Sequence, residues 1–278
     1  MKLEEYKQIQ KTINEFQGLS KDCSKMLITK YNSVHPNTLY SILSQEIQFR
    51  TQRTHHKVFE TEKDYYEEYL DAAKKGEPLG IIIRMAVELN TCPALLARKV
   101  LEIFLDKMPN KCDKLSISKM MKDTTLISNK DLAYEIYLCV LYDDQYGAIS
   151  NAISSSVGEE YEFKLERLLN ERNIPYYNED YLRTKGYDKT PDCKLEIPIA
   201  VNGFVINWIE SKARFGSPII HKKYIKEQFL SYWNRFGPGL VIYWFGFLDN
   251  IIQTSENRFI VMDHFPTNII YMDPNSIK

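Results

Sequence analysis

Two carboxylates and a lysine stand around one predicted β-hairpin in the C-terminal half of the chain. Asp192 precedes the first strand of this hairpin, and Glu210 and Lys212 close the second strand. Paired carboxylates bind hard divalent cations such as Mg²⁺, which activate water and stabilise charge on a phosphoryl group. A lysine beside them can stabilise the charge that develops on phosphorus during hydrolysis. The three residues therefore predict metal-dependent hydrolysis of phosphodiester bonds.

The register of the hairpin decides whether these three side chains meet. The strands are predicted at 194–201 and 204–212, because both are rich in β-branched and aromatic residues and Asn202-Gly203 is a strong hairpin signal. Side chains alternate between the two faces of a sheet. With a plain two-residue turn, Asp192 and Glu210 would therefore point to opposite faces, and the site would fail.

Either of two irregularities would bring the side chains back to one face. A three-residue loop, with Gly203 in the left-handed conformation, would pair Asp192 with Lys212 and place it diagonal to Glu210. A compensating bulge near Pro198 is the alternative, since proline cannot donate to the strand ladder. We expect one of the two.

A helix predicted at 159–170 is expected to supply a further acid. Glu162 lies near its start and is a candidate metal ligand, with Glu160 as the alternative at that position. The carbonyl group of Ile209 is another candidate ligand, next to Glu210. The apolar residues expected to face the sheet from this helix are Phe163, Leu165, Leu168 and Leu169.

A second helix, predicted at 224–236, contributes a polar pair. Gln228 and Tyr232 are four residues apart and therefore share one helix face. Gln228 is a candidate catalytic residue because its amide can orient a water molecule or a phosphate oxygen. After this helix, the apolar run 240–245 predicts a strand that is buried on both faces.

Residues 1–150 are predicted to be helical, and residues 151–278 to form a separate α/β domain. Near the N-terminus, three short helices with tight joints have helix-turn-helix character. The third opens at Pro36, and the residues expected to point outward from it are Thr38, Tyr40, Ser41 and Gln45. A second pair is predicted at 81–89 and 93–107, with a turn between them. The fold class is therefore α + α/β with a mixed sheet.

Composition narrows the setting in which the protein works. The 278 residues carry a net charge of −1, so any affinity for nucleic acid must come from local groups. The five cysteines are scattered and form no CxxC pair, which favours a reducing compartment. No apolar run approaches the length of a membrane span, and the N-terminus has no hydrophobic signal core. We expect no membrane partner and a cytosolic or nuclear location.

The longer stretches around these residues carry a resemblance to a known family. The elements Pro191-Asp192, Glu210-x-Lys212 and Gln228-x-x-x-Tyr232 resemble the PD-(D/E)xK nuclease superfamily. More specific are KGYDKTPD at 185–192, WIESKA at 208–213 and YWNRFGPGLVIYW at 232–244. Together they resemble the codanin-interacting nuclease family, which is related to archaeal Holliday-junction-resolvase-like proteins. The likeness is densest from 158 to 247.

This resemblance implies a helical N-terminal part and a restriction-endonuclease-like C-terminal domain that uses Mg²⁺ or Mn²⁺. It implies Asp192 and Glu210 as metal ligands and Lys212 as the catalytic lysine, while Glu162 carries over less directly. It also implies a nuclear and cytoplasmic setting and a codanin-type protein partner.

Three functions from different classes follow from these observations. The first is a metal-dependent nuclease, most simply an endonuclease, for which DNA is favoured over RNA. The second is a catalytically silent nuclease-fold adaptor that binds a large protein partner. The third is a regulator that reads DNA sequence through the helical half. Loss of Lys212 would abolish only the first, whereas loss of Asp192 would leave the second intact.

Overall fold

The computed structural model describes residues 1–60, 63–108, 114–254 and 258–273. The chain divides into two compact units. The first, here called the sheet unit, comprises Met1–Gln8, His35–Ser41 and Ser156–Lys278, and the second, the helical unit, comprises Ile9–Val34 and Ile42–Ser155. The predicted domain division after residue 150 stays a prediction.

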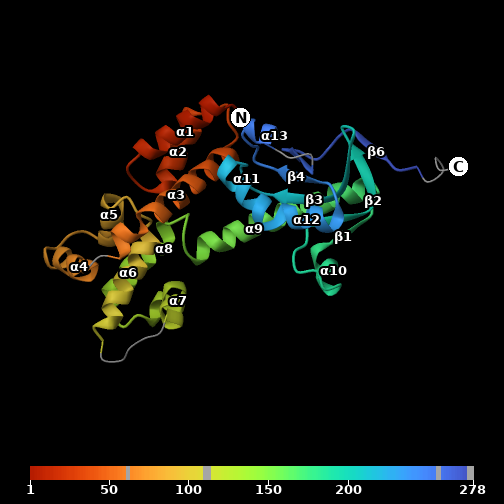
Figure 1. The fold of residues 1–278 in the computed structure, drawn as a ribbon. Coiled ribbons are helices and arrows are strands. Elements are labelled where there is room, and N and C mark those ends of the chain that lie inside the picture. Colours follow the sequence, from red (N-terminus) through yellow and green to blue (C-terminus); the bar gives the residue numbers. More distant parts are fainter. Residues whose placement is uncertain (61–62, 109–113, 255–257, 274–278) are drawn as a thin grey trace. The chain divides into compact units, whose positions relative to one another are not determined.

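The helices α4 to α8 of the helical unit pack around one apolar core. In Figure 1 the helices α4 to α8 gather in one bundle, in which α6 lies against α4, α5 and α8. The fully buried residues of that core include Leu101, Leu132 and Ile136. The helices that precede the first strand of the chain are α1 (Leu3–Glu15), α2 (Ser20–Lys30), α3 (Pro36–Phe59), α4 (Tyr65–Lys74), α5 (Ile81–Glu88), α6 (Pro93–Asp106), α7 (Lys114–Lys122), the 3₁₀ turn η1 (Thr124–Leu126), α8 (Lys130–Tyr142) and α9 (Ala148–Glu171).

Local signals set the ends of several of these helices. Asn90 adopts a positive φ of 50° just after α5, and Pro93 occupies the first turn of α6. This confirms the predicted pair of helices with a turn between them. The side chain of Asn129 caps α8 by accepting hydrogen bonds from the backbone N–H groups of Asp131 and Leu132.

The predicted outward face at the start of α3 is wrong. The helix is one continuous element of 24 residues rather than a short one. Thr38, Ser41 and Gln45 are buried, and only Tyr40 is exposed. The reason is partly visible within the sheet unit, where the Thr38 hydroxyl donates to the carbonyl of Phe245 and the Ser41 hydroxyl accepts from the N–H of Phe215. These side chains anchor the helix by hydrogen bonds and are not presented for contact with DNA.

The sheet unit is built on one mixed sheet, which confirms the predicted fold class. Its strands are β1 (Tyr176–Asn178), β2 (Cys193–Val201), β3 (Phe204–Lys212), β4 (Gly239–Tyr243), β5 (Phe259–Met262) and β6 (Ile269–Tyr271). They run in the order β1-β2-β3-β4-β5, and β6 pairs with β2. The pairs β3–β4 and β4–β5 are parallel, whereas β2 is antiparallel to its neighbours β1, β3 and β6.

The hairpin between β2 and β3 has the second of the two predicted irregularities. Val201 pairs with Phe204, so Asn202-Gly203 is a two-residue turn, with φ values of 51° and 79°. The predicted three-residue loop is therefore wrong, because both turn residues accept the left-handed conformation that a tight hairpin requires. The register shifts further along the hairpin, between Lys194 and Ile199, in the segment that contains Pro198.

This register shift changes which side chains share a face. Between the pairs Ile199–Ile206 and Lys194–Trp208, four residues of β2 stand against one residue of β3. Three extra residues are an odd number, so the shift reverses the faces relative to the turn. Continued by one position beyond Cys193, which pairs with Ile209, the register places Asp192 opposite Glu210 rather than opposite Lys212.

Helices cover both faces of the sheet. One face packs on the C-terminal part of α9, with Leu165 and Leu169 fully buried against the strands. The other face packs on a continuous helical stretch made of α11 (Pro218–Tyr224), the π-helical segment η2 (Ile225–Phe229) and α12 (Leu230–Phe236). Figure 1 shows these two layers around β3 and β4. The remaining helices of this unit are α10 (Glu179–Thr184) and α13 (Asn250–Thr254).

A glycine allows the largest side chain of the sheet to lie flat on it. A Cβ atom at Gly239 would come within 2.1 Å of the indole ring of Trp208, so only glycine fits there. The indole N–H of Trp208 also donates to the carbonyl of Gly237 at 2.8 Å. This close packing fixes β3 against β4 directly before Glu210.

Several details of this unit differ from expectation. Phe163 was expected to face the sheet, yet it is 66% exposed, because it lies on the solvent side of α9. The short elements β1 and α10 were not predicted. In the described parts of both units, Cys23, Cys92, Cys139 and Cys193 are buried free thiols. In the part of the chain that the structure describes, no helix has the length and apolar character needed to cross a membrane.

Candidate active site

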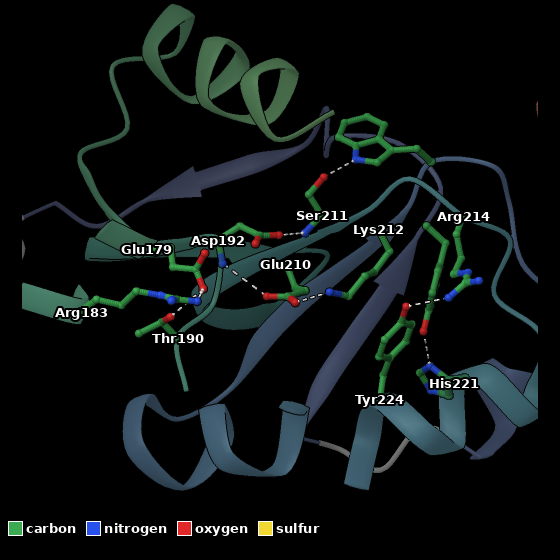
Figure 2. A network of polar contacts seen from close by, with 12 residues as sticks. Glu179, Arg183, Thr190, Asp192, Glu210, Ser211, Lys212, Arg214, His221 and Tyr224 are labelled. Carbon is green, nitrogen blue, oxygen red and sulfur yellow. Dashed lines mark hydrogen bonds and ion pairs between the residues drawn. The ribbon is translucent and has the colours of Figure 1, made fainter. Parts of the chain in front are cut away.

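The two predicted carboxylates and the lysine lie together at one end of the hairpin. Asp192 directly precedes β2, and Glu210 and Lys212 are the last residues of β3 on one face. That face is the one toward α11 and α12. Glu210 comes two residues after Trp208 in β3, so the two side chains point to the same face, and Trp208 packs against these helices. Figure 2 shows Asp192, Glu210 and Lys212 beside one another at the end of the hairpin. The register shift near Pro198 is what brings Asp192 to this face.

Hydrogen bonds join the three residues. The backbone N–H of Ser211 donates to Oδ2 of Asp192 at 2.6 Å, and the backbone N–H of Asp192 donates to Oε2 of Glu210 at 3.3 Å. The ammonium group of Lys212 donates to Oε1 of Glu210 at 2.5 Å. Each carboxylate is thus held in place from the opposite strand or from its own strand (Figure 2).

Burial and mutual repulsion make this pair of carboxylates hard to ionise without a cation. Loss of hydration, followed by the charge of Glu210, raises the pKa of Asp192 to about 8. Burial also raises the pKa of Glu210, although Lys212 opposes the shift. The pKa of Lys212 is raised, because the attraction of Glu210 and Asp192 outweighs its burial, so this lysine stays protonated at neutral pH.

The donor set fits a hard divalent cation. A carboxylate can accept at about four lone-pair positions. The carboxylate of Asp192 accepts one hydrogen bond and that of Glu210 accepts two, so both keep lone pairs that could bind a cation. The two adjacent carboxylates, of which Glu210 is buried and Asp192 half-buried, also lack the positive charge that would balance them, since Lys212 supplies one charge only. Among the described residues, no group of three or more His, Cys, Asp or Glu side chains is already arranged around a metal position.

The upstream acid is better placed at Glu162 than at Glu160. Glu162 lines a hollow of about 260 Å³ together with Asp192, and Glu160 does not. Loss of hydration there, followed by the charge of Asp192, raises the pKa of Glu162 to about 7. The acidic residues that line this hollow are Glu159, Glu162, Glu166, Glu179, Asp180 and Asp192.

The polar pair of the following helix lies on the same side of the sheet as Glu210. Tyr232 is buried, and its ring packs edge-to-face on Trp208 with 5.3 Å between the ring centroids. Gln228 belongs to η2, and its Oε1 is buried with no hydrogen-bond partner among the described residues. A π-helical segment inside an α-helix is often found at a functional site. The remaining candidate, Ile209, is fully buried between its partners Cys193 and Leu240.

Three residues near the site, Glu179, Tyr224 and Arg214, were not predicted from the sequence. Glu179, at the start of α10, accepts hydrogen bonds from Arg183 at 2.7 Å and from Thr190 at 3.1 Å. On the other side, the ring of Tyr224 lies 4.8 Å from the ammonium of Lys212, and its hydroxyl accepts from Arg214. Only the spacing Glu179-x-x-x-Arg183 is a signal that sequence reasoning could have used.

Comparisons with known proteins cover the region that contains these residues. A family model described as a protein of unknown function with a TPD sequence motif matches residues 128–265. Thr190-Pro191-Asp192 spells that motif within the matched region. No solved structure matches the chain significantly.

Curated relatives cover most of the chain. A protein of Xenopus laevis named CDAN1-interacting nuclease 1 is 42% identical over 91% of this chain and 84% of its own length. Its namesake in Homo sapiens is 41% identical over 88% of this chain and 89% of its own length. The one in Danio rerio is 40% identical over 95% of this chain and 89% of its own length. At such identity and coverage, the chain belongs to the CDAN1-interacting nuclease family.

Proposed function

We propose that this protein is a divalent-metal-dependent nuclease that hydrolyses phosphodiester bonds in nucleic acid. The observation that carries the proposal is the register shift near Pro198, because it puts Asp192 and Glu210 on one face beside Lys212. The name of the relatives supports the nuclease activity. DNA is the favoured substrate over RNA, and internal cleavage is the favoured mode.

The metal would be Mg²⁺ or Mn²⁺, held by Asp192, Glu210 and the carbonyl of Ile209, with Glu162 as a further ligand. When bound, such an ion supplies an activated water and stabilises negative charge on the phosphoryl oxygens. Hydrogen bonds from neighbouring residues orient the two carboxylates before a metal binds. The N–H of Ser211 orients Asp192, and the ammonium of Lys212 orients Glu210.

Two other groups of the site have defined tasks in this proposal. Lys212 acts through its charge rather than as a base, because its neighbours keep it protonated. It stabilises the negative charge that builds up on the scissile phosphate. The free Oε1 of Gln228 accepts a hydrogen bond from the attacking water and so orients it.

We further propose a codanin-type protein as the partner and the nucleus and cytoplasm as the location. The relatives are named for an interaction with CDAN1, and this chain aligns with them over most of its length. The interaction surface is independent of the metal site in this proposal. Asp192→Ala should therefore leave the affinity for the partner unchanged, as measured by a pull-down with purified partner.

The nuclease proposal is tested with purified protein on labelled branched, flapped and duplex DNA, and on duplex RNA, with Mg²⁺ or Mn²⁺. Wild type should cut at least one DNA substrate, and chelation by EDTA should stop the reaction. Lys212→Ala should cut about 10²-fold to 10³-fold more slowly, the scale expected for loss of one group that stabilises a transition state. Equal cleavage by both proteins would refute the assignment of the site.

The adaptor function is the second candidate, and the observation in its favour is that the relatives are named for an interaction with CDAN1. It predicts that the metal-site variants are inert in cleavage assays to the same degree as wild type. It also predicts that the Asp192→Ala protein still performs its function in cells. Rescue of a deletion by Asp192→Ala separates the two functions.

A further inference from the structure

A second cation, Arg214, follows Lys212 where β3 has ended. The backbone N–H of Arg214 donates to the carbonyl of Lys212 at 2.7 Å, which is a tight three-residue turn around Ala213. The chain therefore bends directly after the last site residue of the strand. Arg214 is half-buried, so its side chain lies against the protein rather than free in solvent.

Tyr224, the last residue of α11, holds both cations at once. Its hydroxyl accepts a hydrogen bond from Nη1 of Arg214 at 3.1 Å. Its ring carries the ammonium of Lys212 at 4.8 Å from the centroid. Figure 2 shows the tyrosine standing between the ends of the two basic side chains. The π-helical segment begins at the next residue and so follows the contact directly.

The two cations differ in what they have left to bind. Lys212 is already paired with Glu210. Arg214 forms no ion pair with any acidic side chain in the described parts of the chain, although ion pairs are formed by other arginines of the same unit, such as Arg167 and Arg183. A guanidinium has five N–H donors, and the contact with Tyr224 uses one of them. A half-buried guanidinium with unused donors can bind an anionic partner.

The geometry of a guanidinium points to the kind of anion. Arginine presents parallel N–H donors that match two oxygens of a phosphate, whereas a lysine acts as a point charge. Because Arg214 and Lys212 contact the same tyrosine, an anion bound to Arg214 would lie near Lys212. The nucleic acid that the proposed function requires carries such a phosphate next to the scissile one.

We propose that Arg214 binds a phosphate of the substrate adjacent to the scissile phosphate, and that Tyr224 is the positioning residue for this arginine. The inference rests on the proposed nuclease function, because it names a contact of the same site. It assigns to Arg214 a role in holding the strand, and to Lys212 the role at the reacting phosphate.

The test measures affinity and cleavage separately. Binding of a labelled duplex or flapped DNA is followed by fluorescence anisotropy with Ca²⁺ in place of the catalytic metal, over a series of salt concentrations. Cleavage kinetics are then measured with Mg²⁺. The variants are Arg214→Gln, Arg214→Lys and Tyr224→Phe, and thermal melting checks that each is folded. The matched control is Arg167→Gln, which removes the same charge from an exposed arginine of α9 in the same unit.

Arg214→Gln should weaken DNA binding about tenfold and reduce the slope of log affinity against log salt by about one, since one phosphate contact is lost. KM should rise more than kcat falls. Arg214→Lys should restore part of the affinity because the charge is kept. Tyr224→Phe keeps the ring over Lys212 but loses the hydroxyl, so it should raise KM severalfold with little change in kcat. Arg167→Gln should resemble wild type.

The failures of the two proposals are distinguishable. If wild type cuts DNA while Arg214→Gln binds and cuts as Arg167→Gln does, the inference about Arg214 is wrong and the nuclease proposal stands. If wild type binds DNA without cutting it and Arg214→Gln binds tenfold more weakly, the nuclease proposal fails and the phosphate contact stands. If wild type shows no affinity for DNA or RNA, the inference about Arg214 is overturned.

Discussion

Buried carboxylates occur in both units, and they are satisfied in different ways. In the helical unit, Glu135 of α8 accepts the backbone N–H groups of Gly80 at 2.7 Å and Ile82 at 3.2 Å, and so caps α5. In the sheet unit, Asp192 and Glu210 lie next to each other, and the ammonium beside them, that of Lys212, is paired with Glu210.

Asp143, after α8, repeats the pattern of the helical unit. It accepts backbone N–H groups of Ala94, Gln145 and Tyr146 at 2.8 to 2.9 Å. Burial raises the pKa of Asp143 even so, because three backbone hydrogen bonds only partly offset the loss of hydration. A raised pKa alone therefore does not mark a functional carboxylate. The difference lies in the neighbours. Backbone N–H groups donate to the carboxylates of Glu135 and Asp143, whereas Asp192 and Glu210 are two acids beside one cation.

The largest expected effect separates the two kinds of carboxylate by activity. Asp192→Asn keeps an oxygen that can accept from the N–H of Ser211, yet it removes one of the two charges that would hold the metal. Cleavage should fall by about 10³-fold. The free energy of unfolding should stay within about 1 kcal/mol of wild type, because a repulsive pair is relieved. An active Asp192→Asn enzyme would break the comparison.

The helical unit should show the opposite pattern. Glu135→Ala leaves two backbone N–H groups at the start of α5 without an acceptor, at about 1 to 3 kcal/mol for each buried group. We expect the free energy of unfolding, measured with urea and circular dichroism at 222 nm, to drop by about 3 kcal/mol. Cleavage per folded molecule should not change. Glu135→Gln is the control, since its single amide oxygen restores one acceptor and about half of the loss.

A buried histidine of the sheet unit, His221, should make the stability of the protein depend on pH. Burial lowers the pKa of His221 to about 4, and its Nδ1 lies 3.0 Å from the hydroxyl of Tyr243. Because the folded pKa lies below the unfolded value of about 6.5, the unfolded chain takes up the proton first as pH falls. The stability that neutral His221 supports is complete above pH 6.5 and is lost between about pH 6.5 and 4.

The measurement is urea unfolding of wild type and His221→Gln at pH 7.5 and pH 4.5. The stability of wild type relative to the variant should decrease by about 2 kcal/mol between these values. Comparing the two proteins cancels the titration of the carboxylates, which both share. A difference that is independent of pH would contradict this prediction, because it would mean that the pKa of His221 is the same in the folded and the unfolded chain.

The smallest expected effect concerns the turn that joins the strands of the site. Gly203 has a φ of 79°, and a Cβ atom there would meet no atom within 4 Å. Gly203→Ala should therefore cost only the backbone strain of about 1 kcal/mol. The metal site should stay intact, because the register shift at Pro198 and not the turn sets its alignment. A loss of cleavage in this variant would show that the turn controls the register.

The hairpin shows how far the sequence predicts this site. The strand residues, the turn signal and Pro198 were sufficient to predict that one irregularity must occur and where it would lie. They were not sufficient to choose between loop and bulge, because Asn202 and Gly203 suit both turn lengths. Glu162 and Glu160 likewise could not be separated, since the choice depends on the rotation of α9 over Asp192.

Other features were beyond reach for a different reason. Thr38 and Ser41 look like surface residues by type, and their burial depends on backbone groups of Phe245 and Phe215, about 170 to 210 positions away. The strand β1 and the helix α10 are three and six residues long, too short for a periodic pattern. The contact of Tyr224 with Lys212 and Arg214 likewise arises only from tertiary packing.

Calorimetric titration of the protein with Mn²⁺ tests the central claim most directly, because it measures whether the paired carboxylates hold an ion. Wild type should bind Mn²⁺ with a measurable heat, and Asp192→Asn should bind more than about tenfold more weakly. Glu135→Gln should bind as wild type does. Absence of binding to wild type, or equal binding by Asp192→Asn, would contradict the account.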